Sequence, residues 1–282
     1  MKIGYSTLAF AHVPLEDAIA GMAEIGYEAL EVAVTREGPA ALKDFTAARR
    51  KKIRAAARKA RLGSPAVACY TEAADGALAG KAFAAYFKDV CDLALELQPG
   101  KSRPIVAWSP LAAAEPVLPA DAQAARAVVE VLAATAKHCG VTLVVKPLPL
   151  PPLDTVAGFS DLVTGADGNH VRANLDLSAF VANGLEPDDC VPELCRLTAY
   201  AHAKDVTVLD GRIVPLLPGD GDFDYPGFMV ALDAHKYKGT VCVELGEEVR
   251  TSESYDPWGV AEYCFDIMRE AREVAEIGWG EF

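Results

Sequence analysis

The sequence is poor in basic residues and lacks the motifs of several large enzyme classes. Its 282 residues include 27 Lys and Arg against 40 Asp and Glu, which gives a formal net charge of −13. Nucleic-acid binding depends on clustered cations, so this balance argues against a nucleic-acid partner. HExxH, GxSxG and GxxxxGK[ST] are all missing. The chain therefore lacks the signatures of zincins, common serine hydrolases and P-loop enzymes.

Paired cysteines and long apolar runs are also missing. The seven cysteines form no CxxC pair and have no regular spacing, which is typical of reduced thiols in a cytoplasmic protein and argues against a zinc ribbon. The apolar run at residues 3–10 is soon followed by Glu16 and Asp17, with no cationic segment before it. We therefore expect a cytoplasmic protein with neither a signal peptide nor a membrane span.

Eight short apolar or β-branched segments predict strands, and helical periodicity lies between them. The predicted strands are residues 3–6, 29–34, 65–70, 104–109, 142–147, 171–176, 199–204 and 240–245. The clearest helices are expected at residues 14–25, 81–97, 121–138 and 257–277. Strands that alternate with helices predict a parallel sheet. Eight such units without a linker or GxGxxG fingerprint favour one domain over residues 1–282, a single (β/α)8 TIM barrel.

Charged side chains close several of the predicted strands. Examples are the runs LVVK, ANLD and VCVE, whose charges are costly to bury unless they are paired or ligated. Because active sites of such barrels lie at the carboxyl ends of the strands, we expect these groups to converge on one cavity. The strand-end set is Glu31, Lys146, Asp176, His202, Lys204, Asp205 and Glu244.

The strand-end residues and their flanking segments resemble the xylose isomerase-like barrels. That family includes sugar-phosphate isomerases and epimerases, ketose 3-epimerases and the endonuclease IV group. The resemblance covers nearly the whole chain and rests on PLEDAIAGMAEIGYEALEV, NLDLSAF, AHAKD, LPGDGDFDYPGFMVALDAHKYKGTVCVEL and SYDPWGVAEYCF. Only five histidines are present, which argues against the trinuclear zinc site of the endonuclease IV branch.

The resemblance implies one divalent ion, usually Mn²⁺ or Mg²⁺, held by Glu, Asp, His and Glu. Asp176, His202 and Glu244 match three of these metal ligands, but Lys146 stands where the first glutamate is expected. Ala179 also replaces a histidine that many members carry. In the family the two glutamates move a proton beside the sugar carbonyl, so Glu244 is the expected catalytic base.

Lys146 leaves two arrangements open. A protonated ammonium cannot ligate a metal and would be repelled by one. Either the ion remains on Asp176, His202 and Glu244 while Lys146 turns away, or Lys146 pairs with Asp176 and Glu244 and the ion is absent. Lys146 is a second catalytic candidate, as an acid/base partner or as a Schiff-base nucleophile.

The sequence thus predicts an isomerase or epimerase that transfers a proton next to the carbonyl of a sugar, sugar phosphate or polyol. His12, Trp108, Lys204 and Asp205 are the expected substrate-binding residues. One alternative is a non-catalytic sugar-binding barrel in which Lys146 replaces the metal. Another is a lyase or dehydratase acting on a keto-sugar or keto-inositol. The expected partner is a small carbohydrate-like molecule, without nucleic acid or membrane, and a homo-oligomer is left open.

Overall fold

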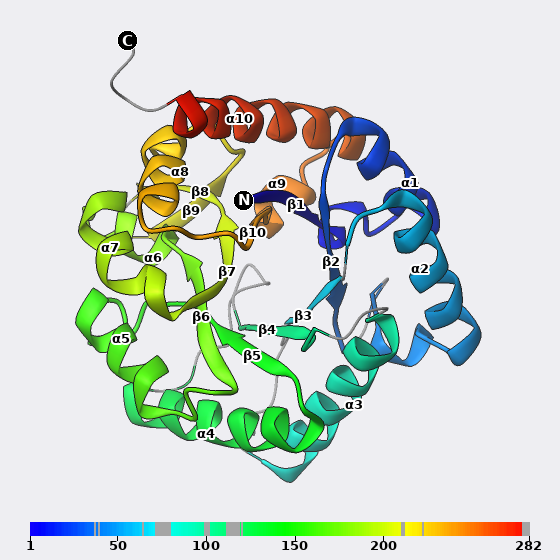
Figure 1. Cartoon of the computed structure of the whole chain (residues 1–282), viewed down its shortest axis with the longest axis horizontal. Helices are drawn as coiled ribbons and strands as arrows, with labels where there is room; N and C mark the ends of the chain where they lie inside the picture. Colours follow the sequence, from blue (N-terminus) through cyan, green and yellow to red (C-terminus); the bar gives the residue numbers. More distant parts are fainter. Residues whose placement is uncertain are drawn as a thin grey trace.

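Eight parallel strands close into a barrel in the computed structural model, and helices surround it (Figure 1). The structure describes residues 1–36, 38, 40–63, 65–70, 80–98, 102–110, 119, 121–209, 212–221 and 223–277. The strand order is β1-β10-β7-β6-β5-β4-β3-β2, and β1 pairs with β10 to close the ring. The predicted (β/α)8 barrel is therefore confirmed. The barrel strands are β1 (Lys2–Ser6), β2 (Ala29–Val34), β3 (Ala66–Tyr70), β4 (Ile105–Ser109), β5 (Thr142–Val145), β6 (Val171–Asp176), β7 (Thr198–Ala203) and β10 (Thr240–Val243).

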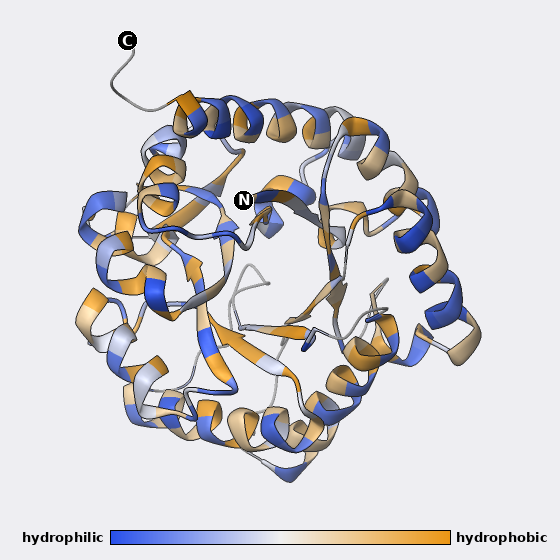
Figure 2. Cartoon of the chain, in the orientation of Figure 1, coloured by the Kyte–Doolittle hydropathy of each residue, from blue (hydrophilic) through white to orange (hydrophobic). Residues whose placement is uncertain are grey.

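The long helices form the outer ring and turn hydrophilic residues outward (Figure 2). They are α1 (Leu15–Ile25), α2 (Ala47–Ala60), α3 (Lys81–Leu97), α4 (Ala122–Cys139), α5 (Val156–Gly165), α7 (Pro187–Leu194), α8 (Tyr225–Ala234) and α10 (Pro257–Ile277). The shorter helical segments are η1 (Thr7–Phe10), η2 (Leu42–Asp44), α6 (Ser178–Val181), η3 (Cys195–Leu197) and α9 (Glu247–Arg250). Within the described residues, no helix combines the length and apolar character needed to cross a membrane.

Helix α1 shows how the local sequence sets an element. Ile19 and Met22 lie on its buried face, as the periodicity predicts. Pro14 is the residue before the helix rather than its first helical residue. Gly26 ends the helix at a φ of 123°, and its N–H donates to the carbonyl of Met22. Such a positive φ favours glycine, which explains the sharp end of the helix.

An additional antiparallel hairpin follows β7, where the sequence analysis assigned no strand. It consists of β8 (Asp205–Leu209) and β9 (Arg212–Leu216), which pair only with each other in the described structure. Val208 and Leu209 are exposed, so the run lacks the burial of a barrel strand. Pro215 lies within β9 and argues against a central strand. It is tolerated because β9 is an edge strand.

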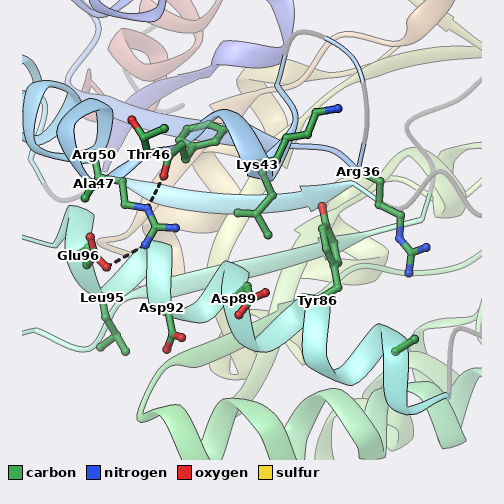
Figure 3. Close-up of a pocket in the computed structure, with 13 residues that line it drawn as sticks. Arg36, Lys43, Thr46, Ala47, Arg50, Tyr86, Asp89, Asp92, Leu95 and Glu96 are labelled. Carbon is green, nitrogen blue, oxygen red and sulfur yellow. Dashed lines mark hydrogen bonds and ion pairs between the residues drawn. The ribbon is translucent and has the colours of Figure 1, made fainter.

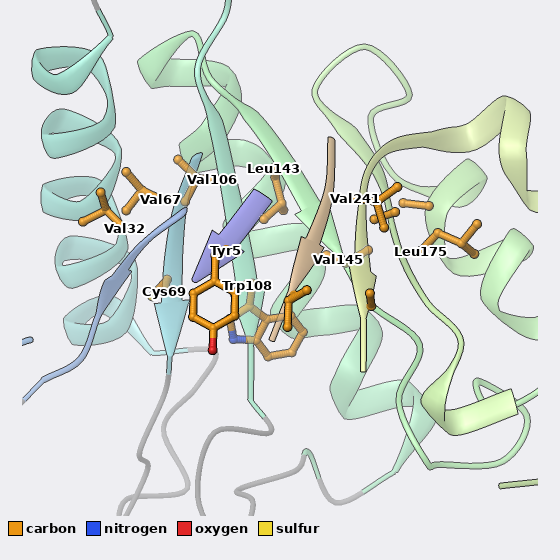
Figure 4. Close-up of a cluster of buried hydrophobic side chains, with 14 of the residues drawn as sticks. Tyr5, Val32, Val67, Cys69, Val106, Trp108, Leu143, Val145, Leu175 and Val241 are labelled. Carbon is orange, nitrogen blue, oxygen red and sulfur yellow. The ribbon is translucent and has the colours of Figure 1, made fainter. Parts of the chain in front are cut away.

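Alternate residues of the barrel strands contribute to two apolar layers. The larger layer lies between strands and helices and includes Val32, Val67, Val145 and Trp108 (Figure 4). The smaller layer lies inside the barrel and is built mainly from small or β-branched side chains, which include Ala33, Ala66, Ala68, Ala107, Val144 and Cys242. Successive residues of a strand face opposite sides of the sheet. The layer to which a strand's apolar residues belong therefore shows which of its polar residues face the interior.

Candidate active site at the carboxyl ends of the strands

Charged side chains from several strands converge inside the barrel at the carboxyl ends. Val144 faces inward and Val145 outward, so Lys146 faces inward directly after β5. The same alternation brings Glu244 inward after β10, where it follows inward-facing Cys242. The charged groups are almost completely buried, with exposed fractions of 0% for Glu31, 1% for Lys146, 1% for His202, 2% for Asp176 and 2% for Glu244.

Lys146 joins two of these carboxylates. Its Nζ donates to Asp176 Oδ2 at 3.2 Å and to Glu244 Oε1 and Oε2 at 3.1 and 3.2 Å. Lysine and carboxylate side chains are rarely buried without a partner. The contacts of Lys146 with Asp176 and Glu244, which one of the two arrangements requires, are therefore present in the structure.

His202 lies between two further carboxylate contacts. Its Nε2 is 2.8 Å from Glu31 Oε2, and its Nδ1 is 2.8 Å from Glu244 Oε2. The Asn174 side-chain amide lies 3.1 Å from the same Nδ1. A register shift between Ala173 and Asn174 accompanies the pairing of β6 with β7. Carboxylates at both ring nitrogens hold the imidazole in its doubly protonated, charged form.

Two more side chains complete the cluster around Glu244. The Tyr70 hydroxyl lies 3.1 Å from Glu31 Oε1 and 3.3 Å from Glu244 Oε2, and shares its proton between them. Lys204 Nζ lies 3.5 Å from Glu244 Oε1. Glu244 is thus the hub of the cluster, with contacts from two lysines, a histidine and a tyrosine.

The pairing decides the protonation of Lys146 and its acidic partners. Burial alone disfavours a charged ammonium, but attraction by Glu244 and Asp176 outweighs it and raises the pKa of Lys146 above its ordinary value. Burial likewise favours the neutral carboxyl of Glu244, yet Lys146, His202 and Lys204 hold its pKa well below the ordinary value. The pKa of Asp176 is also lowered, because Lys146 and Lys204 outweigh burial. Lys146 is therefore an ammonium facing carboxylates.

His202 and Tyr70 also carry protons at neutral pH. Burial opposes the imidazolium, but Glu31 and Glu244 raise the pKa of His202 to about 9. Burial and the nearby charges of Glu244 and Glu31 raise the pKa of Tyr70 well above its ordinary value. The cluster consequently holds proton donors on several sides of a buried carboxylate.

Asp176 and Asp205 are held by local contacts of different kinds. The backbone N–H and hydroxyl of Ser178 both donate to Asp176 Oδ1, at 3.0 and 2.6 Å. Asp205 accepts backbone hydrogen bonds from residues 206, 219 and 221 at 3.0, 3.0 and 3.1 Å. Asp205 thus holds the loop after the β8–β9 hairpin in place. None of these hydrogen bonds joins it to the charged cluster.

The remaining predicted substrate-binding residues lie in different places. Lys204 joins the cluster through Glu244. His12 is exposed after η1. Trp108 belongs to the apolar layer between strands and helices and is 1% exposed (Figure 4). Its indole therefore faces away from the barrel interior, a position that gives no support to substrate binding by this residue.

Tyr70 and Asn174 belong to the cluster but were not among the residues expected from the sequence. Glu31 appeared among the strand ends, although it lies within β2 rather than at its end. Tyr70 closes β3 with an aromatic side chain, which is typical of an ordinary core residue. A period of two counted back from Asp176 marks Asn174 as inward-facing. That signal could have found Asn174.

The donor atoms of the cluster have a spacing that could hold a metal, but its charges do not suit one. Ligand atoms of Asp176, His202 and Glu244 all lie within 4.8 Å of one another. Lys146 Nζ contacts both carboxylates of this group, and both nitrogens of His202 face carboxylates. A divalent ion here would face an ammonium at short range and a ligand without a free lone pair. The residues in this arrangement therefore do not fit the ion that the resemblance implied.

A hollow lies outside the barrel, between α2 and α3 (Figure 3). It has a volume of about 1130 Å³. Basic side chains of the α2 side face acidic side chains of α3, and Arg50 pairs with Glu96 at 2.8 Å. Arg36 lies over the Tyr86 ring at 5.3 Å. This hollow contains none of the buried acid–base groups and is separate from the candidate site.

A parallel (β/α)8 barrel with acids, lysines and a histidine at the strand ends defines a class of barrel with potential for acid–base chemistry. Residues 19–259 match the family model of the xylose isomerase-like TIM barrel, and the chain belongs to that family. A search among curated proteins finds no match to the sequence.

Solved structures of ketose 3-epimerases have the same fold. A D-psicose 3-epimerase from Clostridium cellulolyticum H10, solved with D-tagatose, has a TM-score of 0.73 and 18% identity over 96% of this chain and 99% of that one. An L-ribulose 3-epimerase has a TM-score of 0.67 and 18% identity over 99% and 98%. A Mycobacterium smegmatis protein of the same barrel type, in complex with magnesium, has a TM-score of 0.66 and 17% identity over 97% of each chain.

Proposed function

We propose that the protein is an isomerase or epimerase that transfers a proton at the carbon next to the carbonyl of a sugar or polyol. The observation that carries this proposal is the contact of Lys146 Nζ with both oxygens of Glu244 at the carboxyl ends of the strands. It places a fixed positive charge beside a carboxylate, the two groups that enolisation requires. The ketose substrates of the structurally similar epimerases support the sugar class.

Glu244 is the proposed base and Lys146 the group that stabilises negative charge on the carbonyl oxygen. In the free protein Glu244 is a weak base. Burial raises its pKa, but the neighbouring cations outweigh burial and hold the pKa low. A ligand oxygen that accepts a hydrogen bond from Lys146 draws the ammonium away from Glu244 and raises the basicity of the carboxylate. Proton removal then leaves an enolate whose oxygen faces Lys146. Lys204 is the proposed contact for a neighbouring ligand oxygen.

Hydrogen exchange tests this function directly. D-psicose, D-tagatose, D-fructose, L-ribulose and keto-inositols are incubated with the protein in D₂O, and loss of the signal of the proton beside the carbonyl is followed by NMR. We expect exchange on at least one compound and a loss of about 10²–10⁴-fold in Glu244→Gln, since a general base contributes on that scale. Glu248→Gln, an exposed change on α9, is the matched control and should retain the rate.

Equal exchange in the wild type and Glu244→Gln, or no exchange on any compound with or without Mn²⁺, would contradict the proposal. The same spectra detect a dehydrated product, which would instead identify the lyase alternative.

A non-catalytic barrel that binds a sugar-like ligand is the second candidate. It is favoured by the number of contacts to Glu244, which leave this carboxylate paired on both oxygens. Saturation-transfer NMR with the same compounds separates the two, because this candidate requires binding without exchange. The single domain over residues 1–282, a homo-oligomer and a cytoplasmic location stay predictions.

A further inference from the structure

The charges of the buried cluster balance without any added ion. Glu31, Asp176 and Glu244 supply three negative charges. Three cations contact these carboxylates, namely Lys146, Lys204 and the His202 ring with a carboxylate at each nitrogen. A divalent ion would leave a buried excess of two positive charges unless protons or other groups departed. Unbalanced charge is strongly disfavoured in a buried site.

The position of Lys146 adds a geometric argument. Its Nζ lies 3.2 Å from Asp176 Oδ2 and 3.1 Å from Glu244 Oε1, and thus bridges two of the three groups whose donor atoms are close enough to share a metal. Lys146 is 1% exposed, so its side chain is enclosed by the barrel. Ion binding would require this enclosed ammonium to leave both carboxylates.

The nitrogen donors of the cluster are also occupied. His202 contacts Glu31 through Nε2 and Glu244 through Nδ1, each at 2.8 Å. A second group of close donors combines His202 with Glu31 and Cys242. Both donor groups therefore depend on a histidine whose two nitrogens already face carboxylates.

We propose that the Lys146 ammonium takes the place of the divalent cation in this barrel, so that the centre binds no divalent ion while this ammonium is present. Lys146→Glu changes the local charge by two units, from balance to an excess of two negative charges. One divalent ion neutralises that excess, and the new carboxylate can provide a fourth donor. The proposal concerns ion binding alone and holds whether or not the protein is a catalyst.

The wild-type protein provides the first test. The full chain, purified without chelator, is incubated with Mn²⁺ or Mg²⁺, separated from free ions, and analysed for all divalent metals by mass spectrometry. We expect far less than one ion per chain and the same thermal midpoint with EDTA or Mn²⁺. About one tightly held divalent ion per chain, or a midpoint lowered by EDTA, would overturn the proposal.

Lys146→Glu provides the second test, with Lys52→Glu on the exposed surface of α2 as the control of equal charge change. We expect Mn²⁺ to bind Lys146→Glu with an affinity more than about a hundredfold above the wild type, since even indirect contacts alter metal affinity about 10–100-fold. Mn²⁺ at about 100 times its Kd should raise the midpoint of this variant by about 5–10 °C. Lys52→Glu should show neither effect.

Lys146→Gln provides a third test, which remains available if Lys146→Glu does not fold. It removes the positive charge without adding a negative one, so its Mn²⁺ affinity should exceed that of the wild type. Wild-type affinity in both folded variants would overturn the proposal. Exchange assays with sugars are independent of these measurements, so failure of the proposed function remains distinguishable.

Discussion

Individual residues of the cluster have protonation states set by their neighbours. Lys146 remains charged despite burial because two carboxylates face it, and His202 is charged because a carboxylate faces each ring nitrogen. Removing one member leaves its partners buried with uncompensated charge, which typically lowers the free energy of unfolding by about 3–5 kcal/mol. The cluster therefore acts as one unit rather than as separate ion pairs.

The charged His202 predicts a pH-dependent stability. Its pKa rises from 6.5 to about 9 on folding, so its contribution is fully present below about pH 6.5 and is lost as the pH rises through 9. Chemical denaturation should show a decrease of up to about 3 kcal/mol over this interval in the wild type. His202→Gln should lack that decrease, whereas the exposed His138→Gln should keep it. Parallel pH profiles for all three proteins would contradict the assigned charge of His202.

Strand-end charges could be predicted from the sequence, but their pairing could not. Lys146, Asp176 and Glu244 each close an apolar run, and their burial had to be compensated in some way. Which compensation occurs depends on the direction of each side chain across the barrel. Tyr70 shows the same limit, since a tyrosine after an apolar run looks like core until the position of Glu31 is known.

At the scale of elements, the first and last helices pack side by side where the ring of helices closes (Figure 1). Trp258 of α10 contacts Phe10 with ring centroids 4.7 Å apart. A Cβ placed on Gly21 of α1 would collide with the Trp258 ring. Glycine at this helical position is thus explained by the close approach of α1 and α10.

This contact predicts opposite effects for two glycine-to-alanine changes in helices. Gly21→Ala should lower the free energy of unfolding by about 1–3 kcal/mol, because overpacking outweighs the gain in helix propensity. Gly165→Ala, at the end of α5 with nothing within 4 Å of its added Cβ, should be neutral or raise it by up to about 1 kcal/mol. Thermal or chemical denaturation measures both. An unchanged stability of Gly21→Ala would show that the helices do not pack this closely.

Helices and barrel strands were predictable because hydrophobic periodicity reports burial. The helices 81–97 and 257–277 have the predicted bounds, and the barrel strands differ from prediction by a few terminal residues. The β8–β9 hairpin was missed because it lies outside the barrel, with exposed apolar residues and Pro215 in one strand. Its position depends on tertiary contacts such as those of Asp205, which no local pattern reports.

Across the whole molecule, the net charge of the chain differs from the charge balance of the buried cluster. The chain carries a formal charge of −13, yet the mutually contacting charges at the strand ends form a balanced set of three cations and three carboxylates, from which the buried Asp205 stands apart. The excess therefore belongs to the rest of the protein. The alternation of eight strands with helices was sufficient to predict the barrel, whereas the balance inside it required the structure.

The state of Lys146 in solution tests the account most directly. Protein labelled with ¹³C-lysine gives one ¹³Cε signal for each lysine, and Lys146→Gln identifies the signal of Lys146 by its loss. We predict that this signal keeps the shift of a charged lysine to at least pH 10, because paired carboxylates raise the pKa above its ordinary value. A titration midpoint below about pH 9, as burial without pairing would produce, would contradict the lysine-centred site.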